Sequence, residues 1–469
     1  MDFTHGVVFT PESVEHRSSD LDVEKLLSGA KYVRIYWVDW VNVRRCRVVP
    51  IAHFKSLLAS NRPGVNIGKV VLGLVNLVLA PGFSPIGEYL YAIDLKSLRP
   101  LPFAPGHLAV LGNFEEKIPA EGKGVEVALC PRTVLRRITE KIKDDFGIQF
   151  LIGFESEFIL LKSTDPVEPA HEHQFSASEG MLAGSTEAAA MEAIGDAITA
   201  AGISLEMFHA EAAPGQYEVV TGPLTPLDAA DALIFTREII VQVAAKHGLR
   251  ATFLPRPFMR SSGSSTHAHI SVHSKGEQKV ASRLSARESQ FLAGLLAHLR
   301  AIVAFTLPTP ASYKRVGDGL WSGGTYICYG NENREAPIRV TNFNSPNSRN
   351  FELRFVDATA NPHLALASII AGGLLAFASQ LPLEIKDCSG ERIAAELSEK
   401  ERLALGITER MPFSSEEGRK CLEADVALRE IMGLEFVEKY LLVNRTLESV
   451  LVDEKESEDQ RLTNWVRFF

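Results

Sequence analysis

Two glutamates, Glu155 and Glu157, stand in the middle of the otherwise apolar run LIGFESEFILL at residues 151–161. Residues two apart on a strand point to the same side of a sheet, so a strand here places the two carboxylates side by side. Two adjacent buried carboxylates raise each other's pKa unless positive charge lies between them. A hard divalent cation with oxygen ligands resolves this conflict, so the pair predicts a metal site with further ligands elsewhere in the chain.

Three other apolar stretches carry acidic, imidazole or guanidinium groups at strand-like positions. They are Glu211 and Glu218 in HAEAAPGQYEVV, His267 and His269 in THAHIS, and Glu352 and Arg354 in NFELRF. A single polar residue at a strand end is common and needs no ligand, but four such strands favour a shared site. Five glutamates with a histidine suit Mg²⁺ or Mn²⁺ better than zinc, which prefers fewer and softer ligands.

Arginines form the second chemical pattern. They are Arg315 in SYKR, Arg334 and Arg339 in NREAPIR, and Arg354 in FELRF. Arginine binds carboxylates and phosphates in a bidentate manner, and phosphoryl transfer requires such groups beside divalent metal ions. For each arginine alone, a surface ion pair is an equally good explanation. The chain has no GxxxxGK[ST] loop and no GxGxxG after a strand, so P-loop and Rossmann nucleotide sites are unsupported.

Composition excludes several other classes of function. The 469 residues carry a formal net charge of -9, which argues against nucleic acid or an anionic membrane as the main partner. Five scattered cysteines without a CxxC pair fit a reducing compartment, and no secretory signal is predicted, so we expect a cytoplasmic protein. The apolar stretch at 364–381 contains serines and a central Gly-Gly pair, which predicts a buried core helix rather than a membrane span.

The elements that must position these residues change in character along the chain. From about residue 30 to 115 the pattern predicts short strands and proline-rich turns, including a turn at Asn42, and residues 119–130 predict a linker. Beyond it, amphipathic patterns closed by glycine predict helices at 131–147, 184–202 and 227–248. Ser414 and Glu417 predict a capping box for a last helical region. The pattern as a whole indicates a small β-rich domain followed by a large α+β domain.

Six motifs in chain order resemble those of the glutamine synthetase superfamily. They are GFESEF, HAEAAPGQYE, THAHIS, SYKR, NREAPIR and FELRFVDATANPHLALASIIAGG. The resemblance implies an α+β fold with an N-terminal β-grasp domain over residues 20–118. A glutamine synthetase-type catalytic domain would follow over residues 125–469, with a curved antiparallel sheet flanked by helices. In this family the N-terminal domain reaches the neighbouring subunit's site, which implies a homo-oligomeric ring with Asp39 supplied in trans.

The resemblance also implies roles for single residues. One Mg²⁺ or Mn²⁺ would be held by Glu157, Glu211 and Glu218, and the other by Glu155, His267 and Glu352. The substrate carboxylate would be bound by His269, Arg315, Arg354 and the backbone of Gly263. ATP phosphates would be neutralised by Arg334 and Arg339. The γ-phosphoryl group would pass to the side-chain carboxylate of glutamate or a related acid, and an amine would attack the acyl phosphate, with Asp39, Arg315 and Arg334 as catalytic residues.

Four positions depart from the family pattern. Trp321 stands where glutamine-forming members carry a glutamate that holds and deprotonates ammonium, and an indole binds a cation only through its face. Asn347 matches a usual lysine, Ser265 a usual glycine, and Asn42 the glycine of a D-x-x-G motif, whereas His209 of the H-x-E motif is kept. We therefore expect an ATP-dependent ligase in which a bulkier, less charged amine replaces ammonia, with Trp321 as an apolar wall and Asp39 or another acid removing the proton.

Three alternatives remain open on the sequence. The first is an ammonium-dependent glutamine synthetase with an altered ammonium site. The second is a relative that stops at phosphoryl transfer. The third is a non-catalytic scaffold member of the family, although the six metal-ligand positions all carry competent residues.

Overall fold

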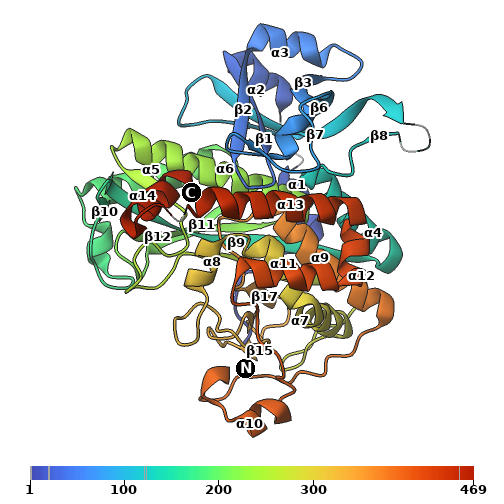
Figure 1. Ribbon diagram of the computed structural model, residues 1–469, viewed down its shortest axis with the longest axis vertical. Helices are drawn as coiled ribbons and strands as arrows, with labels where there is room; N and C mark the ends of the chain where they lie inside the picture. The colour runs from blue at the N-terminus through green and yellow to red at the C-terminus, as the bar shows by residue number, and fades with distance from the viewer. Residues whose placement is uncertain (1–2, 19–21, 121, 123, 454) are drawn as a thin grey trace.

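The structure is a computed structural model that describes residues 3–18, 22–120, 122, 124–453 and 455–469. Figure 1 shows a small sheet with two helices at one end of the molecule and a larger sheet packed among helices next to it. This mixture of sheets and helices confirms the predicted α+β class. The domain boundaries stay predictions, and the predicted start at residue 20 lies outside the described residues.

The small sheet has the strand order β2-β1-β7-β6-β3, and β8 also pairs with β7. Its strands are β1 (Tyr32–Val38), β2 (Arg44–Pro50), β3 (Gly64–Gly68), β6 (Glu88–Pro100), β7 (His107–Ala120) and β8 (Gly124–Glu126). Helices α2 (Val23–Gly29) and α3 (Ile51–Leu58) accompany it, and β4 (Leu74–Val75) pairs with β5 (Val78–Leu79) in a separate short hairpin. Asn42, in the turn between β1 and β2, has a φ of 65°, the left-handed conformation expected of a turn residue. The predicted linker at 119–130 instead contains β8, which adds a strand to this sheet.

The large sheet has the order β11-β12-β9-β14-β17-β16-β15, and β10 and β13 also pair with β9. Its strands are β9 (Ile148–Thr164), β10 (Val167–Pro169), β11 (Leu205–Ala210), β12 (Gln216–Leu224), β13 (Arg250–Thr252), β14 (Thr266–Ser274), β15 (Tyr329–Asn331), β16 (Ile338–Thr341) and β17 (Asn350–Leu353). All of these pairings are antiparallel except that of β15 with β16. The long strand β9 therefore joins the two halves of the sheet, with β12 on one side and β14 on the other.

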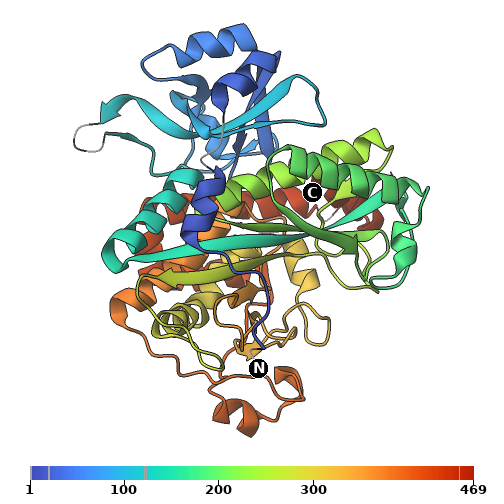
Figure 2. The same ribbon diagram turned by 180° about the vertical axis from the view of Figure 1, so that it is seen from behind.

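Helices surround the large sheet and include the three predicted after residue 130. The described helices are α1 (Pro11–Ser18), α4 (Pro131–Phe146), α5 (Thr186–Ala200), α6 (Pro226–Lys246), α7 (Ala286–Thr306), α8 (Pro310–Arg315), α9 (Pro362–Ser379), α10 (Glu399–Ala404), α11 (Ser415–Ala424), α12 (Val426–Met432), α13 (Leu434–Leu451) and α14 (Glu458–Phe468). Short 3₁₀ turns lie at Lys69–Leu72, Ser178–Met181 and Ala394–Glu396. In Figure 2 the dark-blue N-terminal segment runs from α1 past the strands of the large sheet. There His5 N donates to Ser345 Oγ, and Ser348 Oγ donates to the carbonyl oxygen of His5.

The ends of the helices follow the sequence signals in most cases. Gly147 ends α4 in the left-handed conformation, and the Asn361 side chain caps α9 by accepting from two backbone N–H groups. Ser414 caps α11 by accepting from Glu417 N at 3.1 Å, as expected. The predicted capping box is nevertheless incomplete, because the Glu417 carboxylate accepts from the N–H of Phe413 rather than from that of Ser414.

Two long apolar helices, α7 and α9, pack against each other in the core. Both are long and apolar enough to span a membrane by length and composition, but 72% and 83% of their most apolar windows are buried inside the protein. This burial confirms the prediction of a core helix at 364–381. The helices approach closely at Gly294, where an added Cβ would lie 2.2 Å from the carbonyl oxygen of Gly372. Glycine is required here because any side chain would push the two helices apart.

A buried network of ionisable side chains connects helices α4, α6 and α9 with the small sheet. Asp231 on α6 accepts from Arg132 of α4 at 2.7 Å and lies 2.8 Å from His363 Nε2 on α9. The same Arg132 donates to Asp94 of β6 at 2.9 Å, which links the network to the small sheet. Burial raises the pKa of Asp231, but the Arg132 guanidinium and His363 outweigh it and hold that pKa well below its usual range. The carboxylate is therefore ionised, and its charge is matched within the core.

Replacing Asp231 with alanine is expected to lower the free energy of unfolding by about 3–5 kcal/mol, because it leaves the buried Arg132 charge without its main partner. Denaturant unfolding followed by circular dichroism measures this loss. The matched control is Asp144→Ala on the exposed side of α4, which should change stability by less than about 0.5 kcal/mol. Equal stabilities for the two variants would contradict a role for the network.

Candidate active site

The strand register of the large sheet brings the predicted metal ligands together. Glu155 on β9 lies opposite His267 on β14, and Glu157 lies opposite Glu218 on β12. Because β17 pairs with the side of β14 opposite to β9, Glu352 joins them from a fourth strand. Ligands that are up to about 200 residues apart in the chain thus meet in the middle of the sheet.

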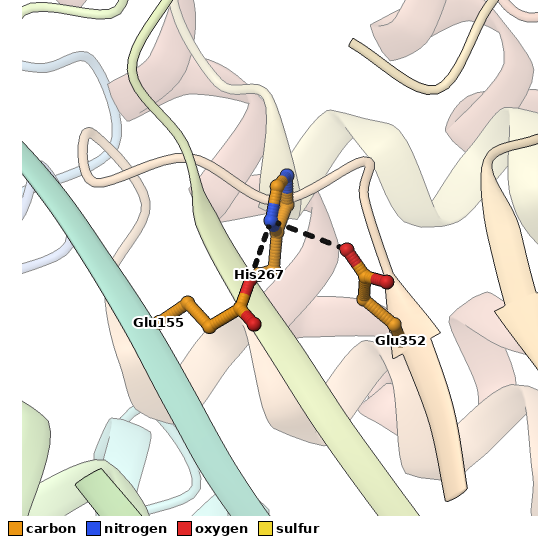
Figure 3. A group of neighbouring side chains, drawn as sticks. All are labelled: Glu155, His267 and Glu352. Atoms are coloured by element: carbon orange, nitrogen blue, oxygen red, sulfur yellow. Dashed lines mark hydrogen bonds and ion pairs between the residues drawn. The ribbon is translucent and has the colours of Figure 1, made fainter. Parts of the chain in front are cut away.

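The first cluster consists of Glu155, His267 and Glu352 (Figure 3). His267 Nδ1 lies 2.9 Å from Glu155 Oε2 and 3.4 Å from Glu352 Oε1, and the two carboxylates approach it from different strands. These three residues are the set that the sequence predicted for one metal ion. His269 Nε2 also lies 3.0 Å from Glu155 Oε1. Burial lowers the pKa of His269, but the Glu155 carboxylate raises it to about 9.

Two arginines hold Glu352 from the other side. Arg354 donates to Glu352 Oε1, and Arg339 Nη1 lies 2.9 Å from Glu352 Oε2. Burial raises the pKa of Glu352, but Arg354 and the two nearby histidines bring it down to about 2. Glu352 is therefore a fixed anion that links the metal cluster to the predicted arginines.

The second cluster consists of His209, Glu211 and Glu218. His209 Nε2 lies 3.2 Å from Glu218 Oε1, and Nδ1 lies 3.7 Å from Glu211 Oε1. The hydrogen bond to Glu218 raises the pKa of His209 to about 9. Burial, followed by the Glu157 charge, raises the pKa of Glu211 to about 7. The site therefore holds more negative charge than the protein itself compensates.

The sequence predicted Glu157 as a ligand together with Glu211 and Glu218, but Glu157 is not a member of the second cluster. Its Oε2 accepts from Ser265 N at 2.9 Å and from Gln216 Nε2 at 3.0 Å, and its Oε1 accepts from Ser265 Oγ at 2.6 Å. Ser265 stands where the resemblance implies a glycine, and its hydroxyl adds one of the three hydrogen bonds that hold Glu157. The residue in close contact with Glu211 and Glu218 is instead His209, which lies near the end of β11, two residues before Glu211.

The donor atoms of the two clusters fit hard divalent cations. All six residues of the two clusters offer carboxylate or imidazole atoms that lie within 4.8 Å of the others in their cluster, and carboxylate oxygens are in the majority. Oxygen-rich sets of this kind suit Mg²⁺ and Mn²⁺, whereas structural zinc sites use sulfur and nitrogen. The residues that would hold the ions are Glu155, His267 and Glu352 in one cluster, and Glu211, Glu218 and His209 in the other, with Glu157 nearby.

Arg315 lies in the core beside the clusters, at the end of α8, and is only 2% exposed. Its Nη2 donates to Arg354 O at 3.0 Å, and no carboxylate pairs with it among the described residues. Burial lowers its pKa, which means that its charge is poorly compensated. Gly263 packs against it so tightly that a Cβ there would lie 2.4 Å from Arg315 Cγ. A buried guanidinium with unused donors is a ready site for a carboxylate or phosphate.

Three predicted site residues, Asp39, Arg334 and Trp321, lie outside the two clusters. The Asp39 carboxylate turns into its own loop, where it accepts from Val41 N, Val43 N and Arg45 Nε, and burial raises its pKa to about 6. Arg334 is exposed on the loop before β16. Trp321 lies in a loop near Arg354. Arg354 Nη2 donates to the carbonyl oxygen of Trp321 at 2.8 Å. The roles of these residues stay predictions.

A cavity of about 310 Å³ opens beside the first cluster. Glu155, His269 and Ser271 line it, together with Asn347, which stands where the family carries a lysine. Val7 and Phe9 of the N-terminal segment form part of its wall. The cavity therefore combines apolar surface with polar groups that lead directly to a predicted metal ligand, as small-molecule sites do.

Several known proteins are similar to this chain in sequence and fold. Residues 128–461 match the family model of the glutamine synthetase catalytic domain. The chain is 36% identical over 449 residues to Protein fluG of Emericella nidulans, covering 93% of this chain and 49% of that protein, so it spans about half the length of this relative. It is 32% identical over 451 residues to Gamma-glutamylpolyamine synthetase GlnA3 of Streptomyces coelicolor, covering 90% of each. The crystal structure of a novel glutamine synthase homolog matches with a TM-score of 0.76 at 26% identity, covering 94% of this chain and 99% of that one.

Glu211→Gln tests whether the second cluster is a metal site. A pKa raised from 4.5 to about 7 means that the folded state binds more protons than the unfolded state between these values, so ion-free stability should fall as pH rises through them. In EDTA the variant is expected to be more stable than the wild type at pH 7 and to lose part of this pH dependence. Thermal unfolding across a pH series measures both effects.

Adding Mg²⁺ or Mn²⁺ should reverse the order of stability. At about 100 times its dissociation constant an ion stabilises the wild type by about 2.7 kcal/mol, and the variant should gain less because it has lost a charged ligand. Glu192→Gln on the exposed side of α5 is the matched control. A metal-dependent gain in Glu211→Gln as large as that of the wild type would show that Glu211 is not a ligand.

Proposed function

The chain belongs to the glutamine synthetase family, and from this premise we propose that it joins an organic amine to the side-chain carboxylate of glutamate or a related acid. The family consists of ATP-dependent carbon–nitrogen ligases that use divalent metal ions and act on small molecules. In the proposed reaction the carboxylate accepts the γ-phosphoryl group of ATP, and the amine then attacks the acyl phosphate. The substrates are thus ATP, an acid and an amine.

The observation that carries this proposal is the unpaired guanidinium of Arg315 beside the acidic clusters. A buried arginine without a carboxylate partner among the described residues is costly unless a ligand supplies the negative charge. The aliphatic part of Arg315 packs against Gly263, and its Nη2 donates to Arg354 O, so the carboxylate of an amino acid placed beside this guanidinium would lie close to Glu352, the partner of Arg354. We assign the binding of the acid to Arg315, Arg354 and the Gly263 backbone.

We assign ATP to the cavity of about 310 Å³ beside the first cluster. Its apolar wall from Val7 and Phe9 suits a flat base, and its inner end reaches Glu155 and His269. This position also gives His269 a role on the phosphate side of the site, in addition to the carboxylate-binding role that the resemblance implies. Arg334 and Arg339 remain our assignments for phosphate charge, although Arg339 is already paired with Glu352 and Glu332.

The residues of the chain would divide the work between binding and charge compensation. The divalent ions, when bound, supply positive charge that offsets the repulsion between phosphate oxygens and the acidic clusters. Arg315 and Arg354 orient the acid so that its carboxylate oxygen faces the phosphoryl group. The apolar surroundings of the sheet exclude water, which would otherwise hydrolyse the acyl phosphate.

Trp321 supports an organic amine as the acceptor rather than ammonium. Its indole is 65% exposed and lies edge-on to Phe175, with ring centroids 6.4 Å apart, so it offers an apolar face beside Arg354. The Streptomyces relative is named a gamma-glutamylpolyamine synthetase, and a polyamine substrate of that relative agrees with an amine larger than ammonia here. The competing proposals are an ammonium-dependent glutamine synthetase, a relative that stops at phosphoryl transfer, and a scaffold without catalysis.

We also propose a homo-oligomeric ring with active sites between subunits, and a cytoplasmic location. The ring agrees with the contacts of Asp39, because its carboxylate bonds within its own turn and its carbonyl oxygen accepts from Asn361, so none of these bonds joins it to the acidic clusters of this chain. Asp39 would serve a neighbouring subunit's site only after its bonds to Val41, Val43 and Arg45 open.

Purified protein with ATP, Mg²⁺ and glutamate is expected to release ADP only when an organic amine is added. Mass spectrometry should detect a product whose mass is that of the acid plus the amine minus water. Glu155→Gln, which removes a predicted metal ligand, is the control for contaminating ATPases. Equal turnover with ammonium chloride at modest concentration would favour the ammonium-dependent enzyme, and ADP release without any amine would favour a phosphorylating relative. Absence of a stability shift with metal and nucleotide would favour a scaffold.

Arg315→Lys is expected to raise the KM for the acid by about 10- to 100-fold, since a hydrogen bond to a charged group contributes about 1.5–3 kcal/mol and lysine cannot form the bidentate pair. Steady-state kinetics with the acid as the varied substrate measures this change. The KM for ATP serves as the internal control, because the nucleotide cavity does not include Arg315. Parallel increases in both constants would contradict a specific role in binding the acid.

A further inference from the structure

A second cavity, of about 350 Å³, lies between the loop at 317–324 and the segment at 331–335. Its lining residues used below are Trp321, Glu332, Arg334 and Glu335. Two arginines connect it to the metal cluster. Arg354 bonds both Glu352 and the Trp321 carbonyl oxygen, and Arg339 bridges Glu352 and Glu332. A single residue, Arg354, therefore contacts both the wall of this cavity and the cluster at the proposed site of phosphoryl transfer.

Glu335 organises the loop that carries Trp321. One of its carboxylate oxygens accepts from Gly319 N at 3.2 Å, and the other accepts from Trp321 N. Gly319 and Trp321 have φ values of 70° and 56°, and this left-handed backbone turns their N–H groups toward one carboxylate. Two backbone donors leave acceptor capacity on an ionised carboxylate, which has about four lone-pair sites. Glu335 can thus hold the loop and still bind a further donor.

Glu335 is also the acidic group at this cavity that lacks a cationic partner. The other acid that lines it, Glu332, pairs with Arg339. Asp318, on the loop that carries Trp321, pairs with Arg410. Of the nearby cations, Arg354 is paired with Glu352, and Arg334 is exposed on the rim. Among the described residues Glu335 forms no salt bridge. A cation entering the cavity would therefore meet one uncompensated carboxylate.

The aromatic wall fits a cation with an apolar body. Trp321, which is exposed, and Glu335 line the same cavity, the Glu335 carboxylate accepts from the backbone N–H of Trp321, and Phe175 lies edge-on to the indole and extends the apolar surface. An ammonium group over an indole face is stabilised by about 0.5–2 kcal/mol, and a neighbouring carboxylate adds to this. Burial raises the pKa of Glu335, despite the opposing effects of the Trp321 and Gly319 N–H groups and of Arg354. A carboxylate with a raised pKa is a better proton acceptor near neutral pH.

We propose that Glu335 takes the place of the acid lost at position 321, binding the ammonium group of an organic amine against the Trp321 indole and accepting one of its protons. The proposal rests on the ligase function proposed above and names the residue that selects a basic amine. The ammonium group transfers one proton to Glu335, and the neutral nitrogen attacks the acyl phosphate carbon. The new carbon–nitrogen bond forms as the carbon–oxygen bond to phosphate breaks. Phosphate leaves and takes the second proton from the nitrogen.

The test compares a basic amine with hydroxylamine in the wild type and in Glu335→Gln. n-Butylamine and 1,4-diaminobutane are cationic at pH 7 and need a proton acceptor, whereas hydroxylamine is largely neutral there and does not. General base catalysis contributes about 10²–10⁴-fold, so the variant should lose at least about 100-fold in kcat/KM for the basic amines. Its loss with hydroxylamine should be at least about tenfold smaller. Glu391→Gln, an exposed acid next to the cavity residue Gly390, is the matched control for charge loss.

A pH series separates this role from a purely structural one. In the variant, only the neutral fraction of n-butylamine can react, so kcat/KM should rise about tenfold per pH unit between pH 7 and 9, well below the pKa of an alkyl amine. The wild type should show a flatter profile. Equal losses with both kinds of amine, an unchanged profile, or a wild type that uses hydroxylamine but neither basic amine would overturn the proposal for Glu335. A wild type that forms no hydroxamate from glutamate and ATP would instead overturn the ligase function itself.

Discussion

The burial of several carboxylates in the middle of one apolar sheet is the constraint on which the rest of the structure depends. Glu155, Glu157, Glu218 and Glu352 all lie on strands of the large sheet, where the loss of water disfavours their charged forms. The negative charge of each glutamate is balanced by different groups. Arg354 and Arg339 hold Glu352, hydrogen bonds from Ser265 and Gln216 hold Glu157, and histidines lie against Glu155 and Glu218. The remaining excess of negative charge is what suits the site to divalent ions and their phosphate ligands.

Precise placement of these groups requires a rigid support, and β9 provides it. The strand pairs with both β12 and β14, so its two glutamates are fixed relative to ligands from both neighbours. The close packing of α7 on α9, and the network around Asp231, hold the helices behind it. A site on central strands moves less than one on loops, which matters where phosphate and carboxylate must meet at bonding distance.

The side of the site that we propose binds the amine is built on loops instead. Trp321 and Glu335 lie in irregular segments, and left-handed residues around Gly319 let one carboxylate bind two backbone N–H groups. Loops tolerate sequence change better than central strands do, so substrate preference can change while the phosphoryl-transfer machinery stays the same. The replacement of an acidic residue by Trp321, which the family resemblance implies, is such a change, and the carboxylate of Glu335 accepts from the backbone N–H of Trp321.

The sequence by itself determined several of the elements, the family and most residues of the two acidic clusters. Period-two spacing identified the glutamates of β9 and the histidines of β14, and helix ends such as Gly147 and Asn361 followed local signals, because these depend on neighbouring residues only. It also showed that Trp321 breaks the family pattern. The β8 strand and the bond from Glu417 to Phe413 were missed, since each depends on a pairing that local propensity does not specify.

Only the tertiary structure decided which polar groups neutralise one another. Spacing could not show that His209 rather than Glu157 makes the close contacts with Glu211 and Glu218, because strand register and side-chain hydrogen bonds choose between them. It could not show that Arg315 lacks a partner, that Asp39 turns into its own loop, or that Glu335 reaches back to Trp321. Charge compensation depends on distances and burial across the whole fold, and residues far apart in the chain acquire these only when it folds.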